Sequence, residues 1–463
     1  MNPWKTFSSG TLYHGNCLKV LKQLPAKSVQ LAITSPPYFG LRSYEGTAVW
    51  IGGDATCDHV EALVRTRGDL AKWSVANAAG GGHAVPSPLQ YKDVCGKCGA
   101  KRVDEQIGLE TVPDCARWQI PVELRDKYPE LQPCRKCFVC AMVLVGRRVR
   151  HVLRDDGIYV LNLGDSYCTV PHGPKGHNSR DDKFGSDART AQGTQANRKP
   201  IAGLQHKDLI GIPWRCAFAL QADGWILRSD VPWVKRTAMP ESSTDRPAKA
   251  LEYIFIFVKE PKYYWDVNAV RTDTRNMRNA DLWFQSVDSP HGLVGMEDEL
   301  LGLDVTNEPL AIKHFAAFPS RLPEPFIKAA TSQHGCCPTC GTCWRRVVKK
   351  EAKKRDRPNQ FTKREGKKGT GNVCANDVVG VTVETLGWEP GCGCPDNKPV
   401  PCKILEPFCG TGTTAVVAQR LGRHFVGIDL SEDYLAMAAK RIQSRGEYGK
   451  TKITETKRKG FFQ

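Results

Sequence analysis

Short apolar runs alternate with polar stretches along the chain, and the residues that follow each run predict where a strand ends. Val29–Thr34 is a mainly apolar run followed by Ser35-Pro36-Pro37-Tyr38. Because proline lacks a backbone N–H, the strand must stop and a loop must begin there. Ile158–Leu163 is a second run. Tyr253–Val258 is six consecutive apolar residues, mostly aromatic or β-branched, which indicates a strand buried on both faces.

The C-terminal part of the chain shows strands that alternate with helices. Lys403–Leu405 and His424–Ile428 have the composition of strands, and Thr413–Leu421 between them has that of a helix ending at Gly422. Ser431 is placed to cap a last helix. Strands that alternate with helices predict an α/β fold with a parallel, doubly wound sheet.

Polar stretches rich in glycine or charge interrupt this pattern at residues 52–140, 170–205 and 336–399, and we interpret them as insertions into one catalytic domain. No apolar stretch approaches the roughly 20 residues that a membrane helix needs. The first residues, Met1-Asn2-Pro3-Trp4-Lys5, lack the basic-then-apolar pattern of a signal peptide. We therefore expect a cytoplasmic protein that contacts no membrane.

Positive charge dominates and is concentrated in two segments. The chain has 66 Lys and Arg against 49 Asp and Glu, a net charge of +17. Arg345–Lys368 holds twelve basic and three acidic residues, and Lys440–Lys459 holds eight against two. Concentrated positive charge favours a polyanionic partner, with phosphate as the usual target. The alternative is a pair of solvated basic loops.

The 19 cysteines are spaced in the manner of metal ligands. A structural zinc ion takes four nitrogen or sulfur ligands, usually from two local pairs, and a chain without an export signal is a poor candidate for a disulfide framework. Two such ligand sets are Cys57, His59, Cys95 and Cys98, and Cys337, Cys340, Cys392 and Cys394. A weaker third set is Cys115, Cys134, Cys137 and Cys140. The alternative is reduced cysteines scattered through the core.

A glycine-rich turn near the C-terminus has the features of a cofactor site. Glu406-Pro407-Phe408-Cys409-Gly410-Thr411-Gly412 lies where a strand turns into a helix. Glycines allow close backbone approach there, and the helix N-terminus offers free N–H groups. Asp429 ends the next strand, where a carboxylate can accept both hydroxyls of a ribose. The motif alone fits NAD nearly as well as S-adenosylmethionine, so an NAD-linked oxidoreductase is an alternative.

Thr34-Ser35-Pro36-Pro37-Tyr38 resembles the catalytic motif of DNA methyltransferases that modify exocyclic amino groups. Such an amino group is a poor nucleophile because its lone pair is delocalised into the ring. The Ser35 hydroxyl and the Pro36 carbonyl would accept hydrogen bonds from it and aim the lone pair at the methyl group of a sulfonium cofactor. Tyr38 would stack on the target base after it is flipped out of the duplex.

The catalytic motif precedes the cofactor turn, which resembles the β class of these enzymes, a circular permutation of the usual methyltransferase sheet. Further segments resemble family motifs in order: Leu12–Cys17, Leu161–Tyr167, Trp233–Arg246 followed by Glu252–Asp266, and His314–Pro319. The resemblance thus implies a permuted Rossmann-like fold that depends on S-adenosylmethionine and carries zinc-ribbon-like insertions. It implies catalytic roles for Ser35, Pro36, Pro37 and Tyr38. It implies cofactor contacts from Phe408, Gly410, Gly412, Thr413, Asp429, Asn16, Phe318 and Pro319.

The resemblance also implies double-stranded DNA as the substrate. Ser35, where other members carry Asp or Asn, is more similar to the N4-cytosine enzymes than to the N6-adenine ones, so N4 of cytosine is the predicted target and N6 of adenine the alternative. Target recognition in the β class falls in the segment that corresponds to residues 267–313. Because that segment is short, we expect the insertions to share DNA contact. The expected phosphate-binding residues are Arg345, Arg346, Lys349, Lys350, Lys353 and Lys354.

Other interpretations remain. A 5-methylcytosine enzyme needs a Pro-Cys nucleophile, and Pro133-Cys134 and Pro401-Cys402 are the pairs present. A zinc-containing nucleic-acid-binding protein with an inactive core is a second alternative, and an RNA substrate a third. The resemblance implies a prokaryotic or phage-encoded enzyme, with a cognate restriction endonuclease as a possible partner.

These interpretations divide the chain into segments. The predicted methyltransferase core comprises residues 1–50, 141–266, 314–335 and 401–445. Cysteine-rich insertions are predicted at residues 51–140 and 336–400, target recognition at 267–313, and a basic tail at 446–463.

Overall fold

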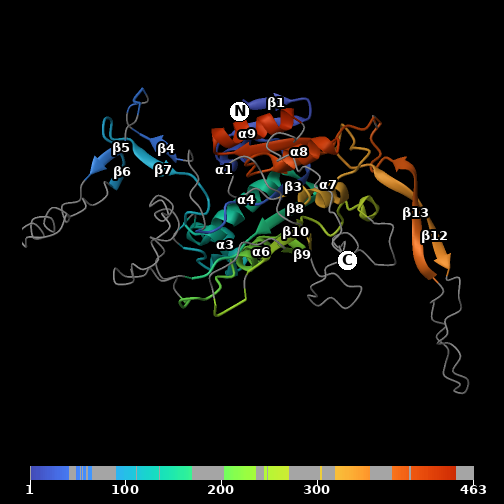
Figure 1. Ribbon diagram of the computed structural model, residues 1–463, viewed down its shortest axis with the longest axis horizontal. Coiled ribbons are helices and arrows are strands. Elements are labelled where there is room, and N and C mark those ends of the chain that lie inside the picture. The colour runs from blue at the N-terminus through green and yellow to red at the C-terminus, as the bar shows by residue number, and fades with distance from the viewer. Residues whose placement is uncertain are drawn as a thin grey trace, which may run out of the picture. The chain divides into compact units, whose positions relative to one another are not determined.

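The computed structural model shown in Figure 1 describes residues 2–40, 48–52, 54, 56–58, 61–64, 90–110, 112–134, 136–168, 203–235, 244–247, 249–270, 303–304, 319–354, 378–395 and 398–444. Two compact units make up the chain. The larger comprises Met1–Arg42 and Ile107–Gln463, and the smaller comprises Ser43–Gln106. The stretch 107–140, which we expected within an insertion, therefore belongs to the larger unit.

The larger unit is built on one sheet, which has nine strands within the described residues, in the order β1-β2-β15-β14-β3-β8-β10-β9-β11. In that order, the strands are Lys5–Phe7, Gly10–His14, His424–Asp429, Lys403–Glu406, Val29–Thr34, Leu153–Leu163, Leu251–Val258, Ile226–Val234 and Leu303–Asp304. Neighbours from β2 to β8 pair in parallel. Strands β14 and β15, from the C-terminal part of the chain, lie between β2 and β3, from the N-terminal part. This strand order confirms the predicted permuted α/β fold.

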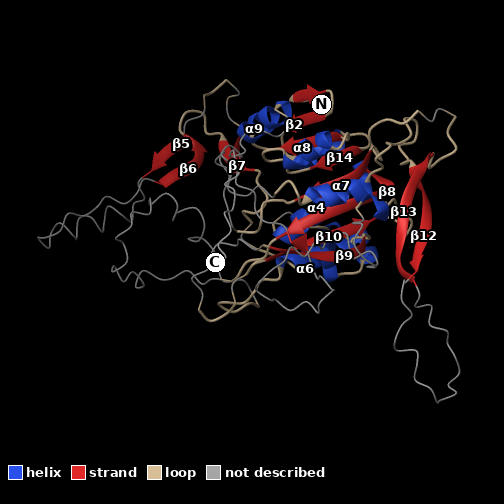
Figure 2. Cartoon of the chain, turned by 45° about the vertical axis from the view of Figure 1, so that its right-hand side comes forward, coloured by secondary structure: helices blue, strands red, loops and turns tan. Residues whose placement is uncertain are grey.

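Helices cover both faces of this sheet (Figure 2). On one face, buried side chains of α1 (Cys17–Gln23), α4 (Phe138–Val152) and α6 (Ile212–Ala222) form one apolar cluster. On the other, α7 (Pro323–Ala330), α8 (Thr413–Arg420) and α9 (Glu432–Gln443) contribute to a second. Shorter helices of the larger unit are η1 (Arg117–Gln119), α3 (Val122–Lys127), η2 (Pro129–Leu131) and η3 (Val267–Ala269). Within the described residues, no helix combines the length and the apolar character needed to span a membrane.

The predicted strands and helices are present, but the sheet is not parallel throughout. Strand β10 pairs antiparallel with both β8 and β9. Strands β9 and β10 are consecutive among the described strands and adjacent in the sheet, an arrangement that suits antiparallel pairing. Strand β10 is buried over its last five residues, as its composition predicts.

The predicted insertions contain antiparallel strands. In the smaller unit, β4 (Ala48–Ile51), β7 (Lys101–Asp104), β6 (Gln90–Cys95) and β5 (Glu61–Val64) form a sheet in that order. In the larger unit, β12 (Arg345–Lys354) pairs with β13 (Val378–Glu389) in a two-stranded ribbon. The predicted target-recognition segment 267–313 and the basic tail lie mostly or wholly outside the described residues.

Candidate active site

The predicted catalytic loop, Ser35-Pro36-Pro37-Tyr38, begins where β3 ends. Strand β3 is buried along its whole length, and Pro36 is buried directly after it, while Ser35 and Tyr38 are partly exposed. Strand β14 runs parallel to β3, with Leu405 paired to Ala32. Because parallel strands end at the same edge, the catalytic loop after β3 and the glycine turn after β14 lie at one edge of the sheet.

Ser35 belongs to a chain of hydrogen bonds. Its hydroxyl donates to the Tyr38 oxygen at 3.1 Å, and the Tyr38 hydroxyl donates to Glu252 Oε2 at 2.5 Å. The Asn162 amide nitrogen lies 3.3 Å from Ser35 Oγ, 2.8 Å from the Tyr38 oxygen and 3.0 Å from Glu252 Oε2. Lys235 forms an ion pair with the other oxygen of Glu252. The hydroxyl protons of Ser35 and Tyr38 therefore point toward the carboxylate. The Ser35 oxygen keeps one lone pair for a further donor, beside the one that accepts from Asn162.

Asn162, Glu252 and Lys235 were not predicted as site residues. Asn162 is 2% exposed within β8, and a polar residue in an apolar run was the one local signal available. The Tyr38 ring packs on Gly164, where an added Cβ would lie 2.6 Å from the ring carbon Cε2. Tyr38 is thus fixed both at its hydroxyl and at its ring.

Asp429 lies at the end of β15 and faces the glycine turn. Its Oδ2 accepts from the Gly410 N–H at 2.6 Å, and its Oδ1 accepts from the Ser431 N–H at 2.9 Å. Burial raises the pKa of Asp429 to about 6, although these two N–H groups favour the charged form. Glu406 is buried at the end of β14, where burial raises its pKa to about 8. Two carboxyl groups with raised pKa values therefore flank the turn.

Arg441, a buried residue of α9, donates hydrogen bonds to the glycine turn, and the sequence did not predict this role. One guanidinium nitrogen donates to the Thr411 carbonyl at 2.8 Å, to the Thr411 hydroxyl at 2.9 Å and to the Thr413 hydroxyl at 3.1 Å. The predicted cofactor residue Thr413 thus bonds to the protein through its hydroxyl. Phe408 is partly buried against the apolar cluster of the α1 face.

The other predicted cofactor residues are placed as follows. Asn16 caps α1, its side chain accepting from the Leu18 N–H at 2.9 Å, and it follows Gly15, whose N–H donates to the Asp429 carbonyl at 2.9 Å. Pro319 is buried shortly before α7, and Phe318 lies outside the described residues. Asn16 therefore directly follows a residue that is hydrogen-bonded to Asp429.

Comparison with known families agrees with this geometry. The profile of a family described as DNA methylase matches residues 29–337 and 403–440, which include both the catalytic loop and the glycine turn. The chain belongs to this family. The predicted amino-methylating DNA methyltransferase is confirmed.

Individual relatives of this DNA methylase are bacterial type II methyltransferases. M.XycI of Xanthomonas campestris pv. cyanopsidis and M.Cfr9I of Citrobacter freundii are each 28% identical over 439 residues, covering 94% of this chain and 88% of the relative. M.SmaI of Serratia marcescens is 30% identical over 316 residues, covering 66% and 75%. Among solved structures, the PvuII DNA methyltransferase, described as cytosine-N4-specific, aligns with a TM-score of 0.43 and 14% identity over 96% of this chain and 95% of its own.

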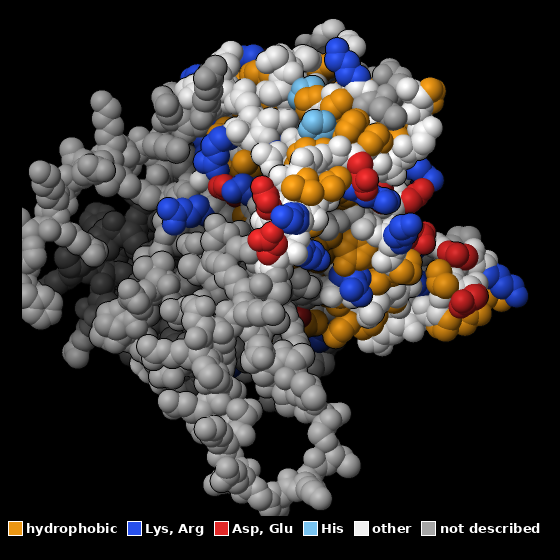
Figure 3. Space-filling view, turned by 90° about the vertical axis from the view of Figure 1, so that its right-hand side faces the viewer, with side chains coloured by type: hydrophobic (Ala, Val, Ile, Leu, Met, Phe, Trp, Pro, Cys, Tyr) orange, Lys and Arg blue, Asp and Glu red, His pale blue; other side chains and the backbone are white. Residues whose placement is uncertain are grey.

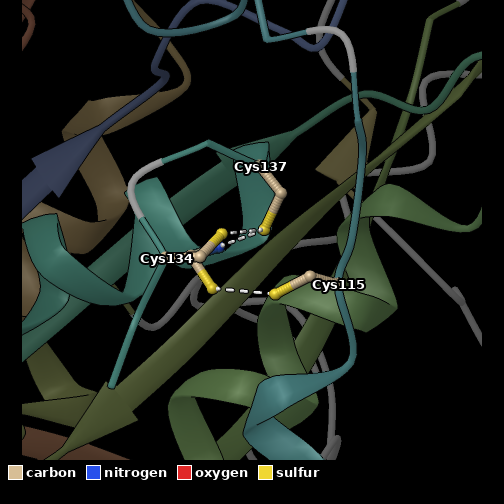
Figure 4. Close-up of side chains that lie close together, drawn as sticks. Cys115, Cys134 and Cys137 are labelled. Atoms are coloured by element: carbon tan, nitrogen blue, oxygen red, sulfur yellow. Dashed lines mark hydrogen bonds between the residues drawn. The ribbon is translucent and has the colours of Figure 1, made fainter. Parts of the chain in front are cut away.

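The DNA methylase brings cysteine thiols together in three groups within the described residues, and all sulfur atoms of a group lie within 4.8 Å of one another. The first group is Cys57, Cys95 and Cys98; His59, its fourth predicted ligand, lies outside the described residues. The second is Cys337, Cys340, Cys392 and Cys394. The third, partly shown in Figure 4, is Cys115, Cys134, Cys137 and Cys140. The third set, which the sequence indicated less strongly than the other two, thus brings four thiols together, the same number as the second group.

A fourth thiol contact was not predicted. Cys343 Sγ lies 3.7 Å from Cys402 Sγ, in a buried cluster with Cys336. Cys402 and Cys134 are the cysteines of the two Pro-Cys pairs, and both pack against other thiols. Neither takes part in the hydrogen-bond chain of Ser35, so this site gives no support to the 5-methylcytosine alternative.

The first ten residues of the basic run form β12. The Arg346 guanidinium is held by the protein, pairing with Asp266 at 2.8 Å and lying over the Trp388 ring, 4.4 Å from its centroid. Lys349 pairs with Glu351 at 2.8 Å, and Arg345 and Lys350 are exposed. Lys353 and Lys354 belong to the same strand. On the face shown in Figure 3, basic and acidic side chains are interleaved.

Proposed function

We propose that this DNA methylase transfers the methyl group of S-adenosylmethionine to N4 of a cytosine flipped out of double-stranded DNA. N6 of adenine is the alternative target. The observation that supports the proposal is that the Ser35 hydroxyl donates to the Tyr38 oxygen, whose own proton is given to Glu252, so that the Ser35 oxygen can act as an acceptor.

The chemistry requires an acceptor for the hydrogens of the base amino group. The Ser35 oxygen and the Pro36 carbonyl would accept these hydrogens and localise the lone pair on nitrogen. Glu252 and Lys235 act through Tyr38: their ion pair fixes the direction of the proton chain. The Ser35 hydroxyl is a neutral acceptor, unlike a carboxylate, and we associate a neutral acceptor with N4 of cytosine.

The glycine turn suits S-adenosylmethionine, which supplies an electrophilic methyl group when bound. Asp429 would accept the ribose hydroxyls, because each of its oxygens accepts one backbone N–H and keeps further lone pairs. Burial raises the pKa of the Glu406 carboxyl to about 8, and a neighbouring cation would favour its charged form; the cofactor carries an ammonium and a sulfonium group. The turn from Phe408 to Gly412 would line the same site.

The partners follow from the same proposal. The relatives are named type II methyltransferases, so we infer double-stranded DNA as the substrate and a bacterial cytoplasm as the place of action, with a companion restriction endonuclease. Zinc would order the polar insertions through the thiols of the first two groups, with His59 as a fourth ligand in the first.

Methylation of host DNA tests the proposal. Expression in a host without DNA methylation, followed by mass spectrometry of digested DNA, should show N4-methylcytosine. The purified Ser35→Ala variant should lose about 10²-fold in kcat, because a contact made chiefly in the transition state is removed. Its affinity for S-adenosylmethionine by calorimetry should stay nearly unchanged.

Ser28→Ala is the matched control, because it removes a serine hydroxyl that bonds only the Pro25 carbonyl of a surface turn among the described residues. This control should keep wild-type kcat. N6-methyladenine alone would contradict the choice of base. A protein that binds neither S-adenosylmethionine nor DNA would contradict the activity itself.

A further inference from the structure

We propose that Cys115, Cys134, Cys137 and Cys140 bind one zinc ion that holds the catalytic loop in position; the effect on catalysis rests on the proposed methyl transfer, whereas the metal site does not. Two sulfur–sulfur distances are 3.4 Å (Cys115–Cys140) and 3.6 Å (Cys134–Cys137). Four sulfurs placed tetrahedrally at about 2.3 Å from zinc lie about 3.8 Å apart. The distances are close to this value and far above the roughly 2.05 Å of a disulfide.

The surroundings of the four thiols suit ligands better than core-filling cysteines. Cys115 and Cys134 are partly exposed, so burial does not explain their presence. Backbone N–H groups donate to two sulfurs, Lys136 to Cys134 and Cys140 to Cys137, each at 3.4 Å. Such N–H donors stabilise the thiolates that zinc requires. In Figure 4 the side chains of Cys115, Cys134 and Cys137 point toward one another.

The group is tied to the first turn of α4. Cys137 caps this helix, and its positive N-terminal end favours thiolate ligands. The segment that carries Cys115 is bound to the same place, because the Phe138 N–H donates to the Val112 carbonyl at 3.1 Å and the Val139 N–H to the Pro113 carbonyl at 3.0 Å. A metal ion here would join the segment around Cys115 to the start of a helix that is buried in the core.

Both parts that the metal would join contact the catalytic loop. The ring of Phe39, which directly follows Tyr38, meets the ring of Phe138 edge-on at 6.0 Å between centroids. The Gly40 N–H donates to the Gly108 carbonyl at 2.8 Å, and a Cβ on Gly108 would lie 3.0 Å from the Tyr38 carbonyl oxygen. The loop is thus supported on one side by α4 and on the other by the segment that leads to Cys115.

Loss of the metal should therefore displace the loop and spare the cofactor turn. The full-length Cys115→Ser variant should contain one zinc fewer per chain than the wild type by elemental mass spectrometry. Its kcat should fall by about 10²-fold, the cost of a small misplacement of catalytic groups, while its Kd for S-adenosylmethionine stays within twofold. Hydrogen exchange of the peptide 35–40 should become faster.

Three further variants separate this role from general damage. Cys216→Ala removes a buried cysteine of α6 that lies outside the thiol groups, and it should keep both zinc and kcat. Phe39→Leu should keep the zinc and lose turnover, because it breaks the contact between loop and helix. Cys115→His supplies another zinc ligand and should restore zinc, hydrogen-exchange protection and turnover, which decides the question if Cys115→Ser does not fold.

Several results would overturn the proposal. An unchanged zinc content in the Cys115→Ser variant would show that these thiols do not bind zinc. A variant that loses zinc but keeps its kcat and its exchange rates would show that the zinc does not position the catalytic loop. A Cys115→His variant that folds and acts normally without this zinc would do the same. Iron in place of zinc would overturn the choice of metal. Because zinc content and hydrogen exchange need no methylation, they remain decisive even if the wild type methylates no DNA.

Discussion

The acceptor strength of Ser35 depends on where its own proton lies. The Ser35 hydroxyl donates to Tyr38 and accepts from Asn162, so one lone pair stays available for another donor; the Tyr38 oxygen can accept because the Tyr38 proton is given to Glu252. Hydrogen bonds in such a chain strengthen one another inside a protein. The end of the chain, a carboxylate paired with Lys235, therefore sets the polarity of the hydroxyl at the other end.

Asp429 predicts a pH dependence of cofactor affinity. Its pKa of about 6 means that the carboxyl is protonated below that pH and charged above it. Ribose hydroxyls donate best to the charged form, so affinity should rise with pH between 5 and 7, with about a tenfold loss from pH 7 to pH 5 if only the anion binds. Calorimetric titration with S-adenosylmethionine at several pH values measures this.

The Asp429→Asn variant is the control for this titration. It is neutral at every pH, so its affinity should be weaker than that of the wild type at pH 7 and flat between pH 5 and 7. A wild-type affinity that does not change over this range, or an Asn variant that keeps the slope, would show that Asp429 does not contact the cofactor.

At the scale of elements, local signals located the strands and helices but did not fix their pairing. Strand β3 follows from an apolar run that ends in prolines, and the start of α9 follows from the capping chemistry of Ser431. The antiparallel placement of β10 depends on pairing with β8, far away in the sequence. The same holds for Asn162 and Glu252, which are 90 residues apart and meet only when those two strands pair.

Two separate features of the structure favour glycine at position 412. The glycine was assigned to close approach of a ligand. Its φ is 77°, and an added Cβ would lie 2.8 Å from the Cβ of Ala438 in α9. Packing against α9 therefore also requires glycine at this position. The residues of the turn carry no pattern from which this contact with α9 could be predicted.

Arg441 predicts that α9 supports the cofactor turn. The Arg441→Met variant keeps a long apolar side chain but leaves the Thr411 and Thr413 acceptors without their donor. We expect the free energy of unfolding to fall by about 2–4 kcal/mol, because bonds from a buried charged donor are lost, and cofactor affinity to fall with it. Urea denaturation and calorimetry measure the two effects.

Lys440→Gln removes a neighbouring positive charge from an exposed position of the same helix and should change neither quantity. If Arg441→Met lowers stability but leaves the Kd for S-adenosylmethionine as it is in the wild type, Arg441 serves the packing of α9 and not the geometry of the turn.

At the scale of the whole molecule, the permuted order has a physical consequence for the site. The catalytic strand comes from the N-terminal part of the chain and the cofactor strands from the C-terminal part, yet β3 and β14 are neighbours. The motif order in the sequence predicts this arrangement. The cysteine spacings predict that Cys115 and Cys140 belong to one group, and the fold brings their sulfur atoms to a separation of 3.4 Å.

The net charge of +17 predicts salt-dependent DNA binding, and β12 supplies one testable part of it. Lys349 and Lys350 are exposed on this strand, and the pairing of Lys349 with exposed Glu351 is weak enough to yield to a phosphate. If both lysines neutralise phosphates, their joint replacement by Gln should reduce the slope of log Kobs against log salt by about 1.8, at roughly 0.9 for each phosphate contact. Fluorescence anisotropy with a duplex at several salt concentrations gives this slope.

The double variant of Lys19→Gln and Lys22→Gln removes the same charge from the exposed side of α1 and controls for net charge alone. Its slope should equal that of the wild type. Equal slopes for both double variants and the wild type would exclude Lys349 and Lys350 from the DNA interface. An equal reduction of the slope in both double variants would show that the slope depends on the total charge of the protein. Contact with a phosphate is local, whereas long-range electrostatic attraction depends on total charge.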